Sequence, residues 1–121
     1  MHVLDSSILI DYFRGTLPKK HLHLINNSAI SILSIAELAD KFLQQQIDFT
    51  QAQEFIEEHI HIHPITSNTA TKAAHIKQQR RKKHPAFGLA DALILATAQE
   101  HQQTLYSKDN DFRGAANILE Y

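Results

Sequence analysis

The chain contains no cysteine and no tryptophan, and it has only three glycines, three prolines and one methionine among 121 residues. The absence of cysteine excludes a disulfide framework, a thiolate zinc site and a cysteine nucleophile. The scarcity of glycine and proline, together with 43% hydrophobic residues, argues against a disordered chain. We therefore expect a compact fold that consists mostly of helices and strands.

Long hydrophobic stretches are also absent. A membrane-spanning helix needs about 18 or more consecutive apolar residues, and no run approaches this length. The N-terminal segment MHVLDSSILIDYF has aspartates within its apolar run and does not resemble a signal peptide. No linker, repeat or low-complexity tract divides the chain. We expect a single cytoplasmic domain spanning residues 1–121, with no membrane partner.

The formal net charge is only −1 at pH 7, but the positive charges are unevenly distributed. Half of the twelve Lys and Arg residues lie within residues 72–83. Clustered cations can contact the phosphates of RNA, whereas the alternative is a solvated helix end whose cations complement the helix dipole. No aromatic residue interrupts the run, so base stacking by this segment is not predicted. The predicted RNA-binding residues are Lys77, Arg80, Arg81, Lys82 and Lys83.

The pattern of apolar residues predicts strands and helices in alternation. Strands are expected at residues 2–5, 29–34, 59–65, 104–107 and 116–121. Helices are expected at residues 6–14, 18–26, 34–46, 50–59, 67–83 and 88–98. Strands that alternate with helices form parallel sheets. The predicted fold class is therefore α/β, with a central, mostly parallel sheet flanked by helices.

Four acidic residues occupy related positions in this pattern. Asp5 and Asp109 follow predicted strands, Glu37 lies in the first turn after another strand, and Asp91 lies near the start of the apolar helix 88–98. Ligands of parallel sheets bind beyond the carboxyl ends of the strands, where these acids could converge. Each pair of carboxylates about 4 Å apart would repel by about 4 kcal/mol at an effective dielectric constant of about 20. A Mg²⁺ or Mn²⁺ ion would offset this repulsion and could activate water toward a phosphodiester.

Each acid also has a local structural explanation. Asp5 is in position to cap the helix that follows it. The segment Ser34-Ile-Ala-Glu37 fits the capping-box pattern, and Asp91 can complement the start of its helix. Asp109 and Asp111 can be ordinary turn residues. The joint placement of the acids, rather than any one of them, favours a metal site.

Three segments, in this order, resemble the PIN domain family and in particular the VapC-type toxins of toxin–antitoxin pairs. VLDSSILIDYF is similar to the opening strand, acid and helix of the family. ISILSIAELADKF is similar to its second motif, and GLADALILATAQEHQQTLYSKDNDF to its closing acidic pair. The resemblance extends over nearly the whole chain and implies a three-layer PIN-like fold.

The resemblance also implies the roles of individual residues. It assigns the catalytic, metal-binding acids to Asp5, Glu37, Asp91 and Asp109, while Ser6, Ser107 and Asp111 match supporting positions. It implies a Mg²⁺-dependent or Mn²⁺-dependent endoribonuclease that forms a homodimer and is blocked by a cognate antitoxin. The apolar faces of helices 34–45 and 49–58 also favour a protein–protein contact. Two alternatives remain: a PIN-type nuclease of RNA processing or repair without an antitoxin, and a non-catalytic RNA-binding module.

The chain has nine histidines, three of which alternate with isoleucine at positions 59, 61 and 63. On a strand, His59, His61 and His63 would share one face. Such a face could bind a transition metal. The simpler interpretation is the polar face of a half-buried strand.

Overall fold

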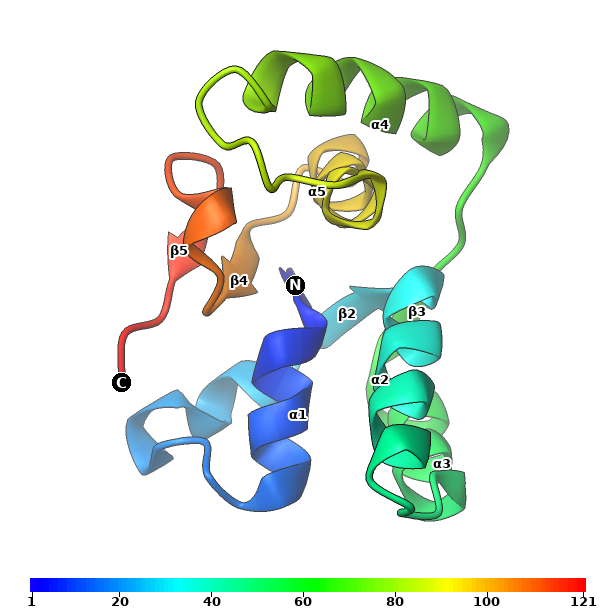
Figure 1. Cartoon of the computed structure of the whole chain (residues 1–121). Helices are drawn as coiled ribbons and strands as arrows, with labels where there is room; N and C mark the ends of the chain where they lie inside the picture. The colour runs from blue at the N-terminus through cyan, green and yellow to red at the C-terminus, as the bar shows by residue number, and fades with distance from the viewer.

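Five parallel strands form one central sheet in the computed structural model, which describes all 121 residues (Figure 1). The strands are β1 (His2–Leu4), β2 (Ser28–Ser31), β3 (His61–His63), β4 (Leu105–Ser107) and β5 (Asn117–Ile118). They lie in the order β3-β2-β1-β4-β5, and every neighbouring pair is parallel. The predicted α/β class is confirmed, and the sheet is wholly rather than mostly parallel.

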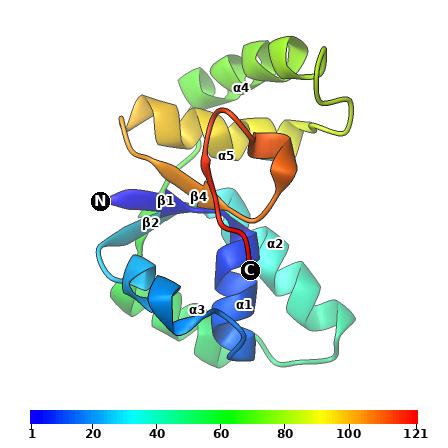
Figure 2. The same cartoon turned by 90° about the vertical axis from the view of Figure 1, so that its left-hand side faces the viewer.

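Helices cover both faces of the sheet and produce three layers. The α-helices are α1 (Ser6–Arg14), α2 (Ile32–Gln44), α3 (Thr50–His59), α4 (Ser67–Arg80) and α5 (Leu89–Glu100). Two short 3-10 helices are η1 (Lys19–Ile25) and η2 (Asn110–Phe112). Figures 1 and 2 show α4 and α5 on one face, with α1, α2 and α3 on the other. No helix has the length and apolar character needed to cross a membrane.

Successive side chains of each strand point to opposite faces of the sheet, which divides the core into two apolar clusters. Val3 and Ala29 pack on the side of α4 and α5. Their chain neighbours Leu4 and Ile30 pack on the side of α1, α2 and α3. Successive strand residues point to opposite faces, so strands of three or four residues supply both layers. This explains why β1 reads as a short apolar run, whereas the edge strand β3 alternates histidine with isoleucine.

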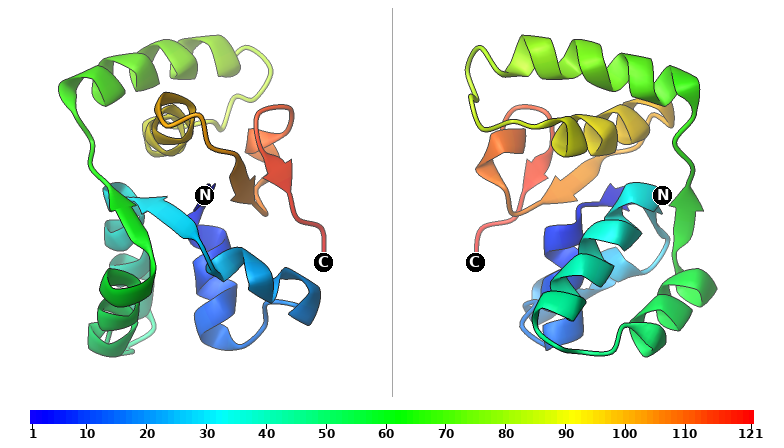
Figure 3. Two further views of the ribbon diagram at one scale, coloured as in Figure 1. Left: turned by 180° about the vertical axis from the view of Figure 1, so that it is seen from behind. Right: turned by 45° about the vertical axis from the view of Figure 1, so that its right-hand side comes forward.

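The strand order reverses between β1 and β4, which are direct neighbours in the sheet. The chain first builds outward from β1 through β2 to β3, and then returns through α4 and α5 to place β4 on the free edge of β1 (Figure 3). The crevice at such a reversal, beyond the carboxyl ends of the strands, is the usual ligand site of parallel sheets. Asp5 follows β1 directly, and Asp109 lies two residues past β4.

The predicted boundary between the second strand and its helix is wrong by about three residues. β2 ends at Ser31 and α2 begins at Ile32, where Ser31 Oγ accepts a hydrogen bond from the Leu33 amide at 3.2 Å. Ser34 is buried inside the first turn and its hydroxyl has no partner, so the predicted capping box does not form. Glu37 consequently lies in the second turn of α2. An uninterrupted apolar run does not mark where a strand becomes a helix.

Other element ends differ from the prediction by smaller amounts. Residues 18–26 contain the 3-10 helix η1 rather than an α-helix, and α4 ends at Arg80 rather than at residue 83. His59 is the last residue of α3, and the closing strand is limited to Asn117–Ile118. These segments are polar or short, so apolar periodicity defines their ends poorly.

The two serines at the start of α2 give a direct test of this helix boundary. Ser31→Ala removes the N-cap acceptor and is expected to lower the free energy of unfolding by about 1 kcal/mol. Ser34→Ala removes a buried hydroxyl without a partner and is expected to leave stability unchanged or slightly higher. Urea denaturation followed by circular dichroism measures both. A larger loss in Ser34→Ala than in Ser31→Ala would contradict the observed boundary.

Candidate metal centre

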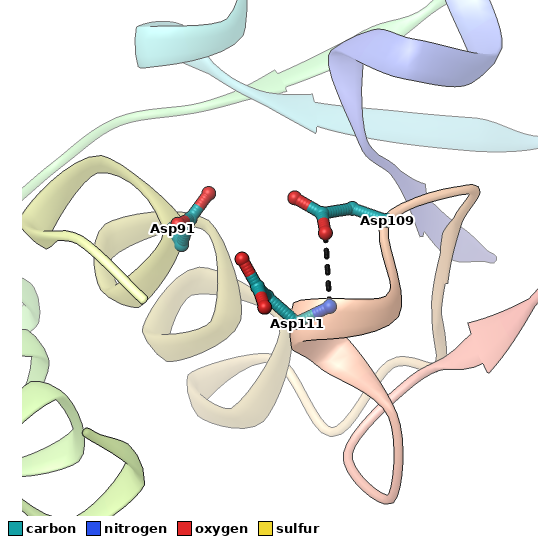
Figure 4. A group of neighbouring side chains, drawn as sticks. All are labelled: Asp91, Asp109 and Asp111. Atoms are coloured by element: carbon teal, nitrogen blue, oxygen red, sulfur yellow. Dashed lines mark hydrogen bonds between the residues drawn. The ribbon is translucent and has the colours of Figure 1, made fainter. Parts of the chain in front are cut away.

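Three carboxylates converge beyond the carboxyl ends of β1 and β4. Asp91 is in the first turn of α5, Asp109 is the N-cap of η2, and Asp111 lies within η2. One oxygen from each side chain lies within 4.8 Å of the other two (Figure 4). The Asp111 amide donates a hydrogen bond to Oδ1 of Asp109 at 2.9 Å, which fixes the turn between them. The family resemblance implied only a supporting position for Asp111, whereas the structure places it beside the other two acids.

Asp91 combines a structural contact with a place in this cluster. Its Oδ2 accepts a hydrogen bond from the Gly88 amide at 3.0 Å, so one oxygen caps α5. Burial raises the pKa of Asp91, and the carboxylates of Asp109, Asp5 and Asp111 raise it further, against the lowering effect of the Gly88 amide. The capping explanation therefore accounts for one oxygen and leaves the crowding of the other acids unexplained.

Asp5 is buried at the N-cap position of α1, yet its side chain does not cap the helix. Its Oδ2 instead accepts hydrogen bonds from the hydroxyls of Ser7 and Ser107, both at 2.8 Å. Burial raises the pKa of Asp5, and the nearby Asp109 adds to this rise, although the two hydroxyls oppose it. Asp5 is thus held rigidly at the junction of β1 and β4.

Glu37 reaches the same region from α2. Its Oε1 is buried and has no hydrogen-bond partner. Burial raises the pKa of Glu37, and the carboxylates of Asp5 and Asp91 raise it further. A buried carboxylate oxygen without a donor is costly, and a bound cation would satisfy it.

The predicted acids therefore lie in one electrostatically coupled group. Asp91 and Asp109 belong to the compact cluster with Asp111. Asp5 raises the pKa of Asp91, and Asp5 and Asp91 both raise the pKa of Glu37. The donor set consists entirely of carboxylate oxygens, which suit Mg²⁺ or Mn²⁺. The residues present fit a divalent metal ion.

Two serines connect the acids to the sheet, and only one of them was predicted. Ser107 donates to Asp5 and accepts a hydrogen bond from the Asp109 amide at 2.9 Å, so it bridges two acids. Ser7 donates to Asp5 and accepts from the Lys108 amide at 3.2 Å. The predicted Ser6 lies against Glu37, where a hydrogen bond from its hydroxyl opposes the rise in the pKa of Glu37. Ser6 lines a surface pocket of about 240 Å³ with Glu37. The spacing of Ser7, two residues after an acid at a helix start, was the available signal.

A partly buried ion pair anchors the loop that carries Asp109. Lys108 Nζ lies 2.6 Å from Oδ2 of Asp11 on α1, and the Tyr121 hydroxyl donates to the same oxygen. Burial alone would raise the pKa of Asp11, but the hydrogen bonds from Lys108 and Tyr121 hold it below its usual value. Nothing in the sequence pattern linked Asp11 to residues almost a hundred positions away.

The basic run predicted to bind RNA divides into two parts. The guanidinium of Arg80 donates to the carbonyls of Asp111 and, at 3.2 Å, Arg113, and it lies 4.9 Å from the centroid of the Phe87 ring. Arg80 therefore supports the backbone of η2 directly beneath the acids. The amines of Lys82 and Lys83 are exposed beyond the end of α4. Their predicted contact with RNA remains a prediction.

The three alternating histidines do not share one strand face. His59 belongs to α3, where its ring lies 4.7 Å from that of Phe55. His63 is buried in β3, stacks on His101 at a ring-centroid distance of 3.6 Å and is hydrogen-bonded to Gln103 at 2.9 Å. Burial lowers the pKa of His63. The expected common face of three histidines is therefore wrong, because the strand begins two residues after His59.

The family model of the PIN domain matches residues 2–118. Since this match covers nearly the entire chain, the chain belongs to the PIN domain family. PIN domains are nucleases that use divalent metal ions, which agrees with the carboxylate cluster. A comparison with curated protein sequences found no match.

The fold is also similar to solved structures of toxin–antitoxin complexes. A chain of a toxin–antitoxin complex from Klebsiella pneumoniae is 26% identical, with a TM-score of 0.74 over 99% of this chain and 97% of that one. FitAcB from Neisseria gonorrhoeae is 20% identical, with a TM-score of 0.68 over 99% and 97% of the two chains. VapBC2 from Rickettsia felis, bound to a DNA fragment from its promoter, is 16% identical, with a TM-score of 0.76 over 99% and 98%. The last two similarities show the fold alone.

The raised pKa of Asp91 predicts a stability effect in the metal-free protein. A carboxyl group whose pKa is raised on folding weakens the folded state as the pH rises above the ordinary carboxyl pKa. Asp91→Asn is therefore expected to raise the Tm at pH 7 in EDTA. A gain of about 1 kcal/mol corresponds to a rise of about 4 °C for a domain of this size.

Differential scanning calorimetry between pH 4 and pH 7 measures this effect. The gap between Asp91→Asn and the wild type should narrow as the pH falls toward about 4, because the wild-type carboxyl group is then protonated. Asp40→Asn, an exposed acid on α2, is the matched control and should leave the Tm unchanged. A destabilised Asp91→Asn at pH 7 in EDTA would contradict the repulsion among the acids.

Proposed function

We propose that this protein is a divalent-metal-dependent endoribonuclease that acts as the toxin of a toxin–antitoxin pair. The observation that carries the proposal is the coupled group of carboxylates at the β1–β4 reversal of a PIN domain. A structural protein would gain nothing from crowding acids in a half-buried crevice. A hydrolytic enzyme gains a site for Mg²⁺, with Mn²⁺ as the alternative.

The metal-binding and catalytic acids in this proposal are Asp5, Glu37, Asp91 and Asp109. Asp111 adds a fifth carboxylate beside Asp91 and Asp109. A bound Mg²⁺ supplies a water of lowered pKa and a positive charge that stabilises the phosphorane-like transition state and the leaving oxygen. The chain's own contribution is to fix the acids at different depths, with Asp5 held by two hydroxyls and Asp91 by the start of α5.

Glu37 is the best placed of these acids to accept a proton. Its Oε1 has no hydrogen-bond donor, and burial with the neighbouring acids raises its pKa. With one oxygen of Glu37 on the metal, the other oxygen would be the one to accept the proton of the attacking water.

The RNA strand would approach over the end of α4. Lys77, Arg81, Lys82 and Lys83 carry positive charge there, and Arg80 contributes charge while it supports η2. Phosphate contacts of this kind hold the backbone without reading sequence. The proposed substrate is RNA, in keeping with the resemblance to VapC-type toxins.

The toxin role rests on the similarity to toxin–antitoxin complexes, in which a chain of the same fold is paired with an antitoxin. We propose a cognate antitoxin, a homodimer and a cytoplasmic location for this chain as well. Exposed apolar side chains are available for such contacts on and after α2, where Ile32, Leu43 and Ile47 are 43%, 70% and 48% exposed. They lie at both ends of α2 and just after it, so they would offer separate apolar contacts rather than one patch.

Metal-dependent cleavage of RNA tests the enzymatic proposal. Purified, antitoxin-free protein is incubated with a mixed RNA pool in Mg²⁺, in Mn²⁺ and in EDTA, beside Asp91→Asn. We expect cleavage with either metal, none in EDTA, and a loss of at least about 100-fold in the variant, which lacks one carboxylate for the metal. Thermal shift with Mg²⁺ should stabilise the wild type by more than it stabilises Asp91→Asn. Wild-type protein that binds RNA but never cleaves it would favour a non-catalytic RNA-binding module.

The role of Ser7 gives a second test, because Ser7 holds Asp5 without touching the metal. Ser7→Ala is expected to lower cleavage by about 10- to 100-fold, in the range of groups that orient metal ligands. The Mg²⁺ concentration for half-maximal activity should rise, and Ser7→Thr, which keeps the hydroxyl, should restore it. Thr71→Ala, at an exposed hydroxyl on α4, is the control. An unchanged Mg²⁺ dependence in Ser7→Ala would mean that Asp5 needs only the Ser107 hydrogen bond.

A further inference from the structure

A pocket lined only by polar and charged residues lies between the end of α4 and the turn after η2. Its volume is about 350 Å³, and its lining contains no hydrophobic residue. We call it the basic pocket. Figures 1 and 2 show that the α4–α5 connection lies on the same side of the molecule as η2. The lining residues are Gln79, Arg80, Lys82, Lys83, His84 and Arg113.

The positive charge of the basic pocket is poorly balanced within the protein. The amines of Lys82 and Lys83 form no ion pair with any carboxylate, and neither does Arg80. Arg113 has one acidic partner, Glu120, with an N–O distance of 3.0 Å. Four cations around one cavity with a single exposed carboxylate repel one another, and an anion would relieve this repulsion.

The basic pocket is joined to the acid cluster by the backbone of η2. Arg80, which lines the pocket, donates to the carbonyl of Asp111, and Arg113 follows Asp111 by two residues. Asp109, Asp111 and Arg113 therefore belong to the same short segment, and Arg80 on α4 is hydrogen-bonded to it. A strand with one phosphodiester at the acids would bring an adjacent part of its backbone to the cations.

We infer that the basic pocket binds a backbone phosphate of the RNA strand adjacent to the one held at the acids, through Lys82, Lys83 and Arg113. This inference rests on the proposed function. Arg113, which lies outside the basic run seen in the sequence, is part of this phosphate site. Within the basic run, Lys82 and Lys83 belong to the site, whereas Arg81 does not. The guanidinium of Arg81 is not part of the pocket and donates instead to the carbonyl of Pro85 at 3.3 Å.

Glu120 acts as an internal competitor for the phosphate. Its carboxylate and the side chain of Arg113 are 75% and 57% exposed, so their ion pair is weak and a phosphate can displace it. Arg113 also donates to Oδ1 of Asn110 at 2.7 Å, which keeps its guanidinium at the pocket when Glu120 leaves. Removal of the Glu120 charge should therefore strengthen RNA binding, an effect that misfolding cannot produce.

Fluorescence anisotropy with a short, labelled single-stranded RNA tests the inference on the full chain in EDTA, where cleavage cannot interfere. Arg113→Gln and Lys82→Gln/Lys83→Gln are each expected to raise the Kd about tenfold or more. The slope of log Kd against log salt concentration should fall by about 0.7, which corresponds to one lost phosphate contact on a single strand. Glu120→Gln should lower the Kd by up to about fivefold.

Two matched control variants distinguish RNA binding at a defined pocket from attraction to the positive charge of the surface in general. Arg14→Gln makes the same charge change as Arg113→Gln at the exposed end of α1, and Lys19→Gln/Lys20→Gln makes the same change as the pocket lysine pair on the exposed surface of η1. Both controls should change the Kd by less than about threefold. Equal losses in Arg14→Gln and Arg113→Gln, or weaker binding by Glu120→Gln, would overturn the inference.

The same proteins assayed for RNA cleavage in Mg²⁺ distinguish this inference from the proposed function. If the wild type cleaves RNA and the pocket variants bind RNA as well as the wild type does, the phosphate site is excluded and the nuclease proposal stands. If the wild type binds RNA but does not cleave it, and the pocket variants bind RNA more weakly, the nuclease proposal is excluded and the phosphate site stands. A wild type that neither binds nor cleaves RNA would overturn both.

Discussion

Mutual repulsion among carboxylates that the fold forces together is the constraint on which the remaining structure depends. The pKa values of Asp5, Glu37 and Asp91 are all raised, first by burial and then by one another or by Asp109. A chain selected for stability alone would separate these groups. Much of the surrounding structure consists of contacts that hold each acid in place against this repulsion.

These contacts come from every layer of the fold. Ser107 at the end of β4 ties Asp5 to the backbone of Asp109, and the Gly88 amide at the start of α5 holds Asp91. The ion pair of Lys108 with Asp11 binds the loop after β4 to α1. Arg80 holds the η2 carbonyls from the opposite side. The acids are thus fixed by neutral hydroxyls, amides and distant cations, while their own charge is left for a ligand.

The sequence was sufficient for the architecture because the relevant signals are local. Apolar runs and helical spacing identified all five strands and the five α-helices, and the parallel arrangement followed from their alternation. The positions of Asp5 and Asp109 after their strands then followed from the general behaviour of parallel sheets. The resemblance to the PIN domain family supplied the same set of acids independently of this geometry.

The contacts that sequence reasoning missed depend on long-range packing or on which of two adjacent residues faces the site. Ser6 and Ser7 are equivalent in a sequence pattern, and only the direction of the first turn of α1 places Ser7 against Asp5. The partnership of Asp11 with Lys108 and Tyr121 has no local signal at all. The sequence shows Arg80 as one cation in a basic run, although it is partly buried and its guanidinium is hydrogen-bonded to the backbone of η2.

The central position of β1 affects the order in which the parts of the sheet can form during synthesis. β1 is made first and can pair with β2 within about thirty residues, but its other edge waits for β4, which is made about one hundred residues later. Contacts between such distant segments form slowly because loop closure must come first. Asp109 and Asp111 follow β4 in the chain, so they join Asp5, Glu37 and Asp91 only after β4 has been made and has paired with β1. The acid cluster is therefore among the last parts of the fold to be assembled during synthesis.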